Sequence, residues 1–384
     1  MSEMMMYADS YSRQFAAQEE FFDFLKKVGG KSRWERKRSK DLRLVAMTGE
    51  DSKIVKTLKE QYEEEGMDIG ILTDTMENTS LVLKAKDQYY PVRSCAIKTI
   101  LDRAGISGAV LKRLDKSVYA RILNDCLKVS KGEALLRISE GKVSAVHGGD
   151  CCDYAILDME QVFLHVVQYL QDTFPGAQFT SGFYDHQGAS ALWELSRNDE
   201  LLGSYRTELE NCGLDEEEIR AAVRVSTSDV GVGGANLYPM LLYGARQVSI
   251  PLGEPLRLGH ENGATLDKFD LQLAKLFGKY QVAVKGLTKL LSISISNPVN
   301  CMVGIMKEVK IPKKYITEAV NLFAAQNGNV SCTAHEIYCA MSEVIFIQTR
   351  DGEEGRRITG MEEKIARALS LDWLVFDVSG SMKW

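Results

Sequence analysis

The chain lacks the long apolar run that a transmembrane helix requires. A helix that crosses a bilayer needs roughly 18 or more consecutive apolar residues, and no stretch of the 384 residues approaches that length. The first ten residues, MSEMMMYADS, also lack the basic segment and apolar stretch of a secretory signal. These absences argue against a membrane-spanning or secreted protein. We therefore expect a cytoplasmic protein with no membrane partner.

Motifs for a tightly bound metal ion are also missing. The eight cysteines are scattered without a CxxC pair, and in a leaderless chain we expect reduced thiols. Residues 147–153 contain five possible ligands, but no second ligand pair with zinc spacing accompanies them. Cys332, His335 and Cys339 share one face of a predicted helix, which packing explains equally well. We predict no metal site.

Nucleotide-binding and catalytic motifs are absent too. The chain has no GxxxxGK[ST] loop and no GxSxG elbow. The turn GVGGAN at 231–236 follows a predicted strand without GxGxxG spacing, so we interpret it as a turn that needs positive φ. Ser226, Ser228, Asp229 and His260 offer the side chains of a triad, but no pattern brings them together. We expect no cofactor and identify no catalytic residue, which favours a protein that is not an enzyme.

The order of predicted strands and helices indicates an α+β fold. Two apolar-alternating pairs, 134–147 around Glu140-Gly141 and 177–197 around Gln187-Gly188, are typical of β-hairpins. Further strands are predicted at 42–47, 81–85, 87–92 and 221–229, and helices at 10–28, 52–65, 110–129, 157–174, 199–211, 215–220, 265–291, 297–308, 312–326, 332–347 and 359–370.

These elements suggest three regions. We expect a mostly helical N-terminal region at 1–130, an α+β core with a hairpin-containing mixed or antiparallel sheet at 131–290, and a helical C-terminal region at 291–384. The 45% apolar content is sufficient for a sizeable core. We also expect a chain that ends at Ser370 to keep its core, at a cost of about 1–3 kcal/mol.

One segment is strongly basic in a chain of net charge −6. Residues 26–43 contain nine cations and one aromatic residue against Glu35 and Asp41 only. They are Lys26, Lys27, Lys31, Arg33, Trp34, Arg36, Lys37, Arg38, Lys40 and Arg43. Cations neutralise phosphates and an aromatic face stacks on an unpaired base, so these ten residues are the candidate nucleic-acid site. A solvated loop, or contact with an anionic protein, would give the same pattern.

Two segments of the middle region carry a resemblance to known proteins. They are YAILDMEQVFLHVVQYL at 154–170 and AAVRVSTSDVGVGGANLYPMLLYGARQVSIPLGEPLRLGHENGATLDKFDLQLAKLF at 221–277. Over about 130–290 the chain resembles a family of phage- and plasmid-borne proteins catalogued as a domain of unknown function. The resemblance implies a mobile-element gene product in a bacterial host cell and implies no chemistry.

Two hypotheses follow for function. In the first, the protein binds single-stranded DNA and assists annealing or recombination, since its hairpin–helix–hairpin order is loosely similar to phage single-strand annealing proteins. In the second, it binds a host protein, for instance as an inhibitor of a defence system; either version allows a homo-oligomer. A groove lined by Tyr and Arg beside residues 26–43 would favour nucleic acid. Acidic cover over that segment would favour a protein partner.

Overall fold

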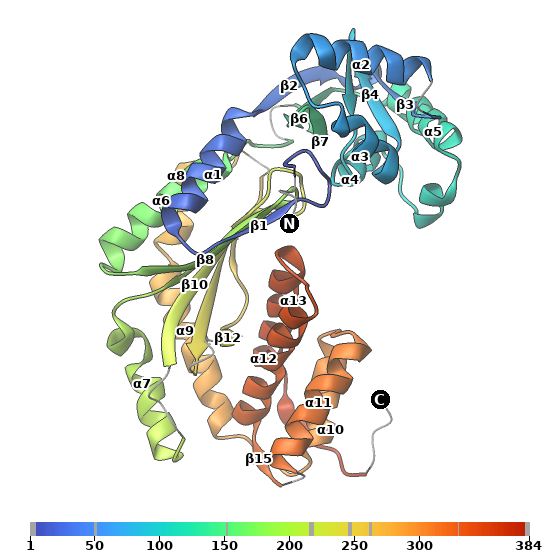
Figure 1. Cartoon of the computed structure of the whole chain (residues 1–384). Helices are drawn as coiled ribbons and strands as arrows, with labels where there is room; N and C mark the ends of the chain where they lie inside the picture. The colour runs from blue at the N-terminus through green and yellow to red at the C-terminus, as the bar shows by residue number, and fades with distance from the viewer. Residues whose placement is uncertain are drawn as a thin grey trace.

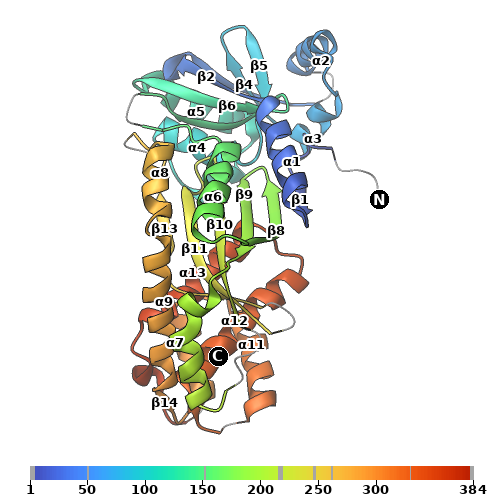
Figure 2. The same ribbon diagram turned by 90° about the vertical axis from the view of Figure 1, so that its left-hand side faces the viewer.

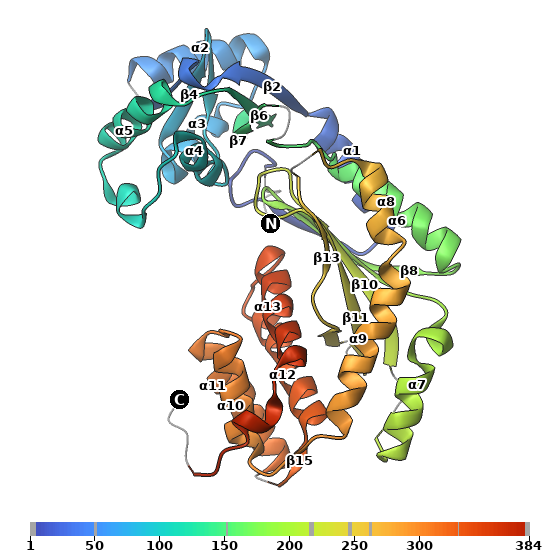
Figure 3. The same ribbon diagram turned by 180° about the vertical axis from the view of Figure 1, so that it is seen from behind.

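The computed structural model describes residues 5–49, 52–150, 153–214, 219–244, 248–260, 263–328 and 330–380. The molecule has three layers: an N-terminal unit at one end, a large central sheet, and a group of C-terminal helices that lies against one face of that sheet (Figure 1, and from the other sides Figures 2 and 3). All named strand pairs are antiparallel. The α+β class expected from the sequence is confirmed.

The N-terminal unit contains two three-stranded sheets and four helices. The sheets have the orders β3-β4-β5 and β2-β6-β7. Their strands are β2 (Ser32–Arg38), β3 (Leu42–Ala46), β4 (Leu81–Ala85), β5 (Gln88–Pro91), β6 (Glu133–Ser139) and β7 (Lys142–Gly148), and the helices are α2 (Lys53–Glu65), α3 (Gly70–Asn78), α4 (Ala96–Ala104) and α5 (Lys116–Val129). Because β6 pairs with β2, the β6–β7 hairpin lies in this unit, so the boundary expected at 131 falls after β7 instead.

The central layer is a seven-stranded sheet of order β1-β8-β9-β10-β11-β12, with β13 also paired to β11. Its strands are β1 (Ser12–Phe15), β8 (Gln178–Asp185), β9 (Gly188–Glu194), β10 (Ile219–Thr227), β11 (Ala235–Tyr243), β12 (Val248–Pro251) and β13 (Leu256–Leu258). Both predicted hairpins are present. Glu140 and Gly141 have φ of 49° and 73°, the left-handed conformation that a two-residue hairpin turn requires at both positions.

Helices cover both faces of the central sheet (Figures 1 and 3). One face packs against α1 (Gln18–Gly30), α6 (Met159–Thr173), α7 (Asn198–Asn211), α8 (Leu266–Leu273) and α9 (Leu276–Leu291). The other face meets α12 (Ala334–Arg350) and α13 (Arg356–Arg367), which pack with α10 (Pro298–Glu308) and α11 (Lys313–Asn327). A two-stranded ladder of β14 (Ser294–Ile295) and β15 (Cys332–Thr333) ties this group together. In the described residues no helix combines the length and the apolar character needed to cross a membrane.

Several local predictions were wrong. The predicted helix at 10–28 is the strand β1 followed by α1, and the predicted helix at 265–291 breaks between α8 and α9. Of the predicted helix at 215–220, residues 219–220 begin β10, and the rest lies outside the described residues. The predicted helix at 110–129 is a 3₁₀ turn (Ala109–Arg113) followed by α5, because Asp115 caps α5 through the amides of Ser117 and Val118.

Candidate nucleic-acid interface

The basic segment folds into the end of α1, the edge strand β2, a 3₁₀ turn (Ser39–Asp41) and the start of β3. Side chains of a strand alternate between its two faces. Arg33 and Lys37 therefore lie on one face of β2, while Trp34, Arg36 and Arg38 lie on the other. The structure divides the ten candidate residues between different surfaces and does not gather them in one.

Three of the ten residues line one groove of about 820 Å³. Lys27 comes from α1, Lys31 from the residue after it and Arg33 from β2. A fourth cation, Arg13 of β1, joins them, and its guanidinium carbon lies 4.8 Å from the ring centroid of Phe15. Sequence analysis missed Arg13, because it precedes the basic run and lies on a separate element, β1, which packs directly on α1.

Aromatic and flexible apolar side chains complete this basic groove. Tyr7 and Tyr11 line it together with Met5, Met6 and Met67. Tyr11 is stacked on Phe24 at 6.0 Å between ring centroids. Two carboxylates, Asp68 and Glu140, also line it. Tyr11 is buried against Phe24, Tyr184 and His186, so Tyr7 is the ring of this pair that can stack on a base. The groove therefore combines four cations with one partly exposed tyrosine, a combination typical of sites for single-stranded nucleic acid.

Acidic neighbours engage much of the basic charge, including three of the four groove cations, since Arg13 also pairs with Glu20 at 3.7 Å. Ion pairs join Lys31 to Glu140 at 3.2 Å, Arg33 to Glu35 at 2.8 Å, Arg36 to Glu133 at 3.8 Å, Lys37 to Glu35 at 2.9 Å and Arg38 to Asp41 at 2.7 Å. Burial by itself would raise the pKa of Glu35, but the hydrogen bonds from Arg33 and Lys37 keep that pKa below its ordinary value. Arg43 donates to the carbonyls of Lys40 and Leu42. Lys26, Lys27 and Lys40 form no ion pair with the described residues.

Trp34 lies outside the basic groove, in a joint between the N-terminal unit and the central sheet. The guanidinium carbon of Arg137 lies 5.2 Å from the Trp34 ring centroid. Arg137 donates from Nε to Oδ2 of Asp229 at 2.6 Å, and both side chains are buried. Tyr154 lies 5.7 Å from Trp34, centroid to centroid. Trp34 is half-buried among these groups, so one aromatic face is already used for packing.

The same joint brings together residues that the sequence singled out separately. Rings of His147, Tyr154 and His260 form one stack, with centroid distances of 3.7 Å and 4.9 Å. His147 Nε2 donates to the backbone carbonyl of Asp229 at 3.0 Å. Burial lowers the pKa of His147 to about 4 and also lowers the pKa of His260. Both imidazoles are therefore neutral at pH 7 and act as packing groups.

The Gly-rich turn completes this joint. Gly231 has a φ of 73°, and a Cβ added there would lie 3.0 Å from Cε1 of His147. The turn thus needs glycine for its backbone conformation and for close approach to the stack. Ser228 donates to the carbonyl of Gln187 instead of contacting His260, so the four triad candidates form no triad.

Metal-ligand candidates also remain apart. Cys151 and Cys152 lie outside the described residues. His335 and Cys339 are neighbours, with 3.8 Å between Nε2 and Sγ, but the closest polar partner of His335 is the hydroxyl of Tyr205 at 2.5 Å. Within the described ranges, no group of three or more His, Cys, Asp or Glu side chains has the geometry to hold a metal ion.

Comparison with known proteins gives no relative. No protein-family model, no curated protein and no solved structure matches this chain. The physical character of the basic groove is therefore the basis for a function.

Proposed function

We propose that the chain binds single-stranded DNA in the basic groove and serves as an accessory protein of a phage or plasmid in its bacterial host cell, where it assists annealing or recombination. The observation that carries the binding proposal is the groove itself. It places Arg13, Lys27, Lys31 and Arg33 beside Tyr7 in a space of about 820 Å³. Cations track the phosphates of a strand, and aromatic rings stack on unpaired bases without sequence preference.

The form of the groove favours a single strand over a duplex. Its cations come from β1, β2 and the end of α1, so no single helix or two-stranded ribbon carries all of them into a major groove. Since the chain has a net charge of −6, binding depends on this local set of cations and not on bulk charge. The affinity should therefore fall steeply with salt.

The alternative, binding of a host protein, draws on a different observation. Five ion pairs engage cations of the basic segment with Glu35, Asp41, Glu133 and Glu140, which lowers the net positive charge near β2. A surface of mixed charge suits a protein partner better than a phosphate backbone.

The test uses fluorescence anisotropy of a labelled oligo(dT) strand with the full chain. Replacing three groove cations, Lys27→Gln, Lys31→Gln and Arg33→Gln together, should make the slope of log affinity against log salt shallower by about 2, at about 0.7 per lost phosphate contact. The matched control replaces three cations outside the groove, Lys26→Gln, Arg38→Gln and Lys40→Gln, with the same change in net charge.

We expect the control triple variant to keep the salt slope of the native chain. Equal loss in both triple variants would show that bulk charge binds the strand and would overturn the groove. If the native chain has no salt-dependent affinity for any single strand at low ionic strength, the host-protein alternative takes its place.

A further inference from the structure

A row of side chains crosses the central sheet at one level, far from the basic segment in sequence. The strand register pairs Phe183 with Ser190, Ser190 with Ser226, Ser226 with Asn236 and Asn236 with Arg257. Residues that pair directly across strands lie on the same face. The row therefore presents an aromatic ring, two hydroxyls, an amide and a guanidinium side by side from five strands.

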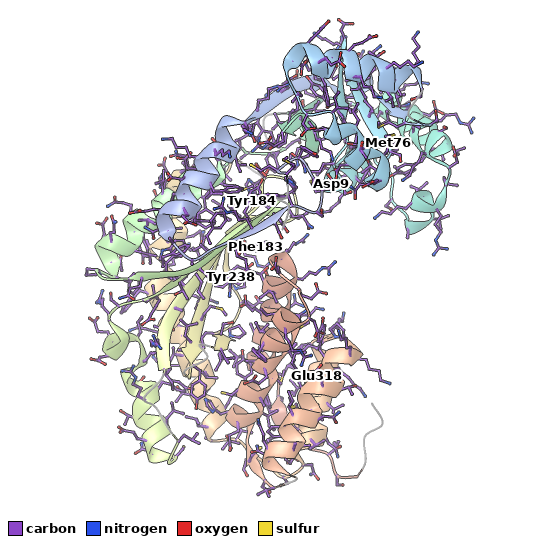
Figure 4. The ribbon with its side chains drawn as sticks, in the orientation of Figure 1. Asp9, Met76, Phe183, Tyr184, Tyr238 and Glu318 are labelled. Atoms are coloured by element: carbon purple, nitrogen blue, oxygen red, sulfur yellow. The ribbon has the colours of Figure 1, made fainter. Side chains whose placement is uncertain are left out.

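This row is the floor of a cavity of about 430 Å³ beneath α13. The helix contributes Arg356, Thr359, Gly360 and Glu363, which share one face, and Gly355 precedes them. In Figure 4 the labels of Phe183 and Tyr238 lie on the central sheet near α13. Small-molecule sites usually have volumes of about 300–1,000 Å³ with a few convergent polar groups. The cavity has both properties.

Two polar side chains of the floor are buried with unused hydrogen-bonding capacity. Ser190 is 6% exposed, and its hydroxyl has no hydrogen-bond partner among the described residues. Asn236 is 7% exposed; its amide nitrogen donates to the hydroxyl of Tyr238 at 3.2 Å, while its side-chain oxygen receives no hydrogen bond from the described residues. Neither of these two oxygens is sealed from solvent, so a ligand in the cavity could form hydrogen bonds with both.

The wall of the cavity carries charges of both signs, from the cations Arg257 and Arg356 and from the carboxyl groups of Asp185 and Glu363. Glu363 accepts hydrogen bonds from Tyr238 at 2.8 Å and from Arg257 at 2.9 Å, so Arg257 is neutralised. Arg356 forms no ion pair with the described residues and starts α13, whose N-cap residue has no side chain to cover the first amides. The amide of Arg357 donates to the carbonyl of Glu354, which leaves the guanidinium of Arg356 and the start of α13 to attract an anion. Asp185 also lines the cavity; burial raises the pKa of its carboxyl, and the charge of Arg356 acts in the opposite direction.

The aromatic ring of Phe183 lines the same cavity as Arg356. The Phe183 ring packs on the backbone of Gly355, where an added Cβ would lie 2.2 Å from Cε1 of the ring. Gly355 has a φ of 53°, so glycine is needed there for conformation and for this contact. The neighbouring amide of Asn236 has an acceptor and one remaining N–H, the pair of groups that reads a base edge.

We propose that this cavity binds a nucleoside monophosphate unit. The phosphate lies at Arg356 and the start of α13, and the nucleoside lies over the floor, where Phe183 contacts the base and Ser190 and Asn236 hydrogen-bond with it. The chemistry is the same for a free mononucleotide and for one nucleotide of a bound strand. This site is separate from the basic groove and does not depend on it.

Isothermal titration calorimetry of the full chain tests the site with the four deoxynucleoside monophosphates, deoxyribose 5-phosphate and inorganic phosphate. We expect at least one nucleotide to bind at least tenfold more tightly than deoxyribose 5-phosphate or phosphate, because only the nucleotide reaches both the wall and the floor. Arg356→Gln should weaken that binding at least tenfold. Equal affinity for phosphate and nucleotides, or no binding of any probe, would overturn the proposal.

A cavity-filling variant separates ligand binding from folding. A Cβ at Gly360 would meet no atom within 4 Å, and leucine is a better helix former than glycine, so Gly360→Leu should fold and fill the cavity. Gly278→Leu in α9 is the matched control, since a Cβ there also meets nothing and Gly278 lies outside the cavity. We expect loss of mononucleotide binding in Gly360→Leu only. Unchanged binding in that variant would refute the site.

A competition experiment distinguishes a free mononucleotide from one nucleotide of a bound strand as the ligand. If a strand supplies the unit, oligo(dT) should displace the bound mononucleotide from the native chain and from the groove variant Lys27→Gln, Lys31→Gln, Arg33→Gln. If the ligand is a free nucleotide, the oligonucleotide should leave it bound. Both results support the cavity. If only the proposal of DNA binding in the basic groove is wrong, the native chain should bind the mononucleotide and should not bind the oligonucleotide.

Discussion

Among single residues, Arg137 and Asp229 form the contact on which the joint between the N-terminal unit and the central sheet depends. Arg137→Met should lower the free energy of unfolding by about 3–5 kcal/mol, because it leaves the carboxylate of Asp229 buried without its cation. Chemical denaturation measures the loss. The double variant Arg137→Met, Asp229→Asn should recover part of it, since no unpaired charge remains. Equal losses in the single and double variants would contradict this role.

His147 predicts a pH dependence of stability. Burial lowers its folded pKa to about 4 from an ordinary value near 6.5, so the unfolded chain binds the proton more tightly. Its contribution is complete above about pH 7 and is lost as the pH falls from about 6.5 to 4. His186, His260 and His335 act in the same direction, because burial lowers their pKa values too.

The variant His147→Gln isolates this contribution. Asp185 and Glu362 oppose it, because burial raises the pKa values of their carboxyls, but the variant leaves both in place. Between pH 4 and 6.5 the free energy of unfolding of the variant should change less steeply, by up to about 1.4 kcal/mol per pH unit. Urea denaturation at several pH values checks this. Parallel curves for variant and native chain would exclude a buried neutral imidazole.

The candidate site shows how far residue-level reasoning from sequence reaches. Three residues of the basic run, Lys27, Lys31 and Arg33, line one groove. The charge pattern marks residues 26–43 as one basic segment and does not indicate the strand β2 within it. Side chains of β2 alternate between its two faces, so Trp34 and Arg36 lie on the opposite face from Arg33. Arg13 and Tyr11 precede the basic run, in a segment that the sequence pattern assigned to a helix and that instead contains the strand β1, which pairs with the distant strand β8.

For whole elements, the hairpins were predictable and several helix boundaries were not. Glu140-Gly141 supplies the left-handed turn that fixes the β6–β7 pairing. The break between α8 and α9 has no Gly or Pro signal; α8 packs on α6 and β13, while α9 packs on α7 and β11. Proline is tolerated at position 239 inside β11. The carbonyl of Pro239 points to the gap between β12 and β13, where it accepts a hydrogen bond from the amide of Leu252. The N–H of a strand residue points to the same side as its carbonyl, so the N–H that proline lacks would not have taken part in a strand pair.

The C-terminal segment after α13 belongs to the core more fully than the sequence suggested. Trp373 is 1% exposed and donates from Nε1 to the carbonyl of Ala368 at 3.0 Å. Phe376 packs so closely on α10 that a Cβ at Gly304 would lie 2.8 Å from its ring. A chain that ends at Ser370 should therefore lose about 3–5 kcal/mol, more than the 1–3 kcal/mol expected from sequence, since removing a buried Trp leaves a large cavity.

Denaturation curves of the truncated and native chains measure this loss, and a point variant resolves one part of it. Asp377 accepts hydrogen bonds from the amides of Ser296 and Asn297 at 2.9 Å and 2.6 Å, at the start of α10. Asp377→Ala should cost about 1 kcal/mol, as loss of a helix cap does. Asp87→Ala is the control, because Asp87 is exposed and makes no polar side-chain contact with the described residues. A truncated chain as stable as the native one would show the segment to be dispensable.

In the molecule as a whole, the N-terminal residues link the N-terminal unit to the central sheet. Asp9 contacts Lys142 at 2.7 Å and Arg93 at 3.5 Å, all three in the interior, and accepts a hydrogen bond from the amide of Ser94. The adjacent carbonyl of Ala8 accepts a hydrogen bond from His186, at the end of β8. Figure 4 labels Asp9 between the two layers. Residues 8–9 therefore connect both layers at one point.

Asp9→Asn should weaken this connection by about 3–5 kcal/mol, because Lys142 and Arg93 stay buried with less compensating charge. Burial alone would raise the pKa of Asp9, but Lys142 holds it below its ordinary value, so acid below about pH 4 should have the same effect in the native chain. Chemical denaturation compares Asp9→Asn with the control Asp87→Asn. A loss under 1 kcal/mol would show that the contact is not needed.

The position of this link in the chain has a consequence for synthesis on the ribosome. Ala8 and its partner His186 are 178 residues apart in sequence, and at about 5–20 residues per second translation needs roughly 10–35 s to cover that interval. During that time β1 has no strand to pair with, and the aromatic rings of Tyr11 and Phe15 have no sheet to cover them. The segment from Ala8 to Phe15 thus stays without its native cover during that interval and is open to chaperones and proteases.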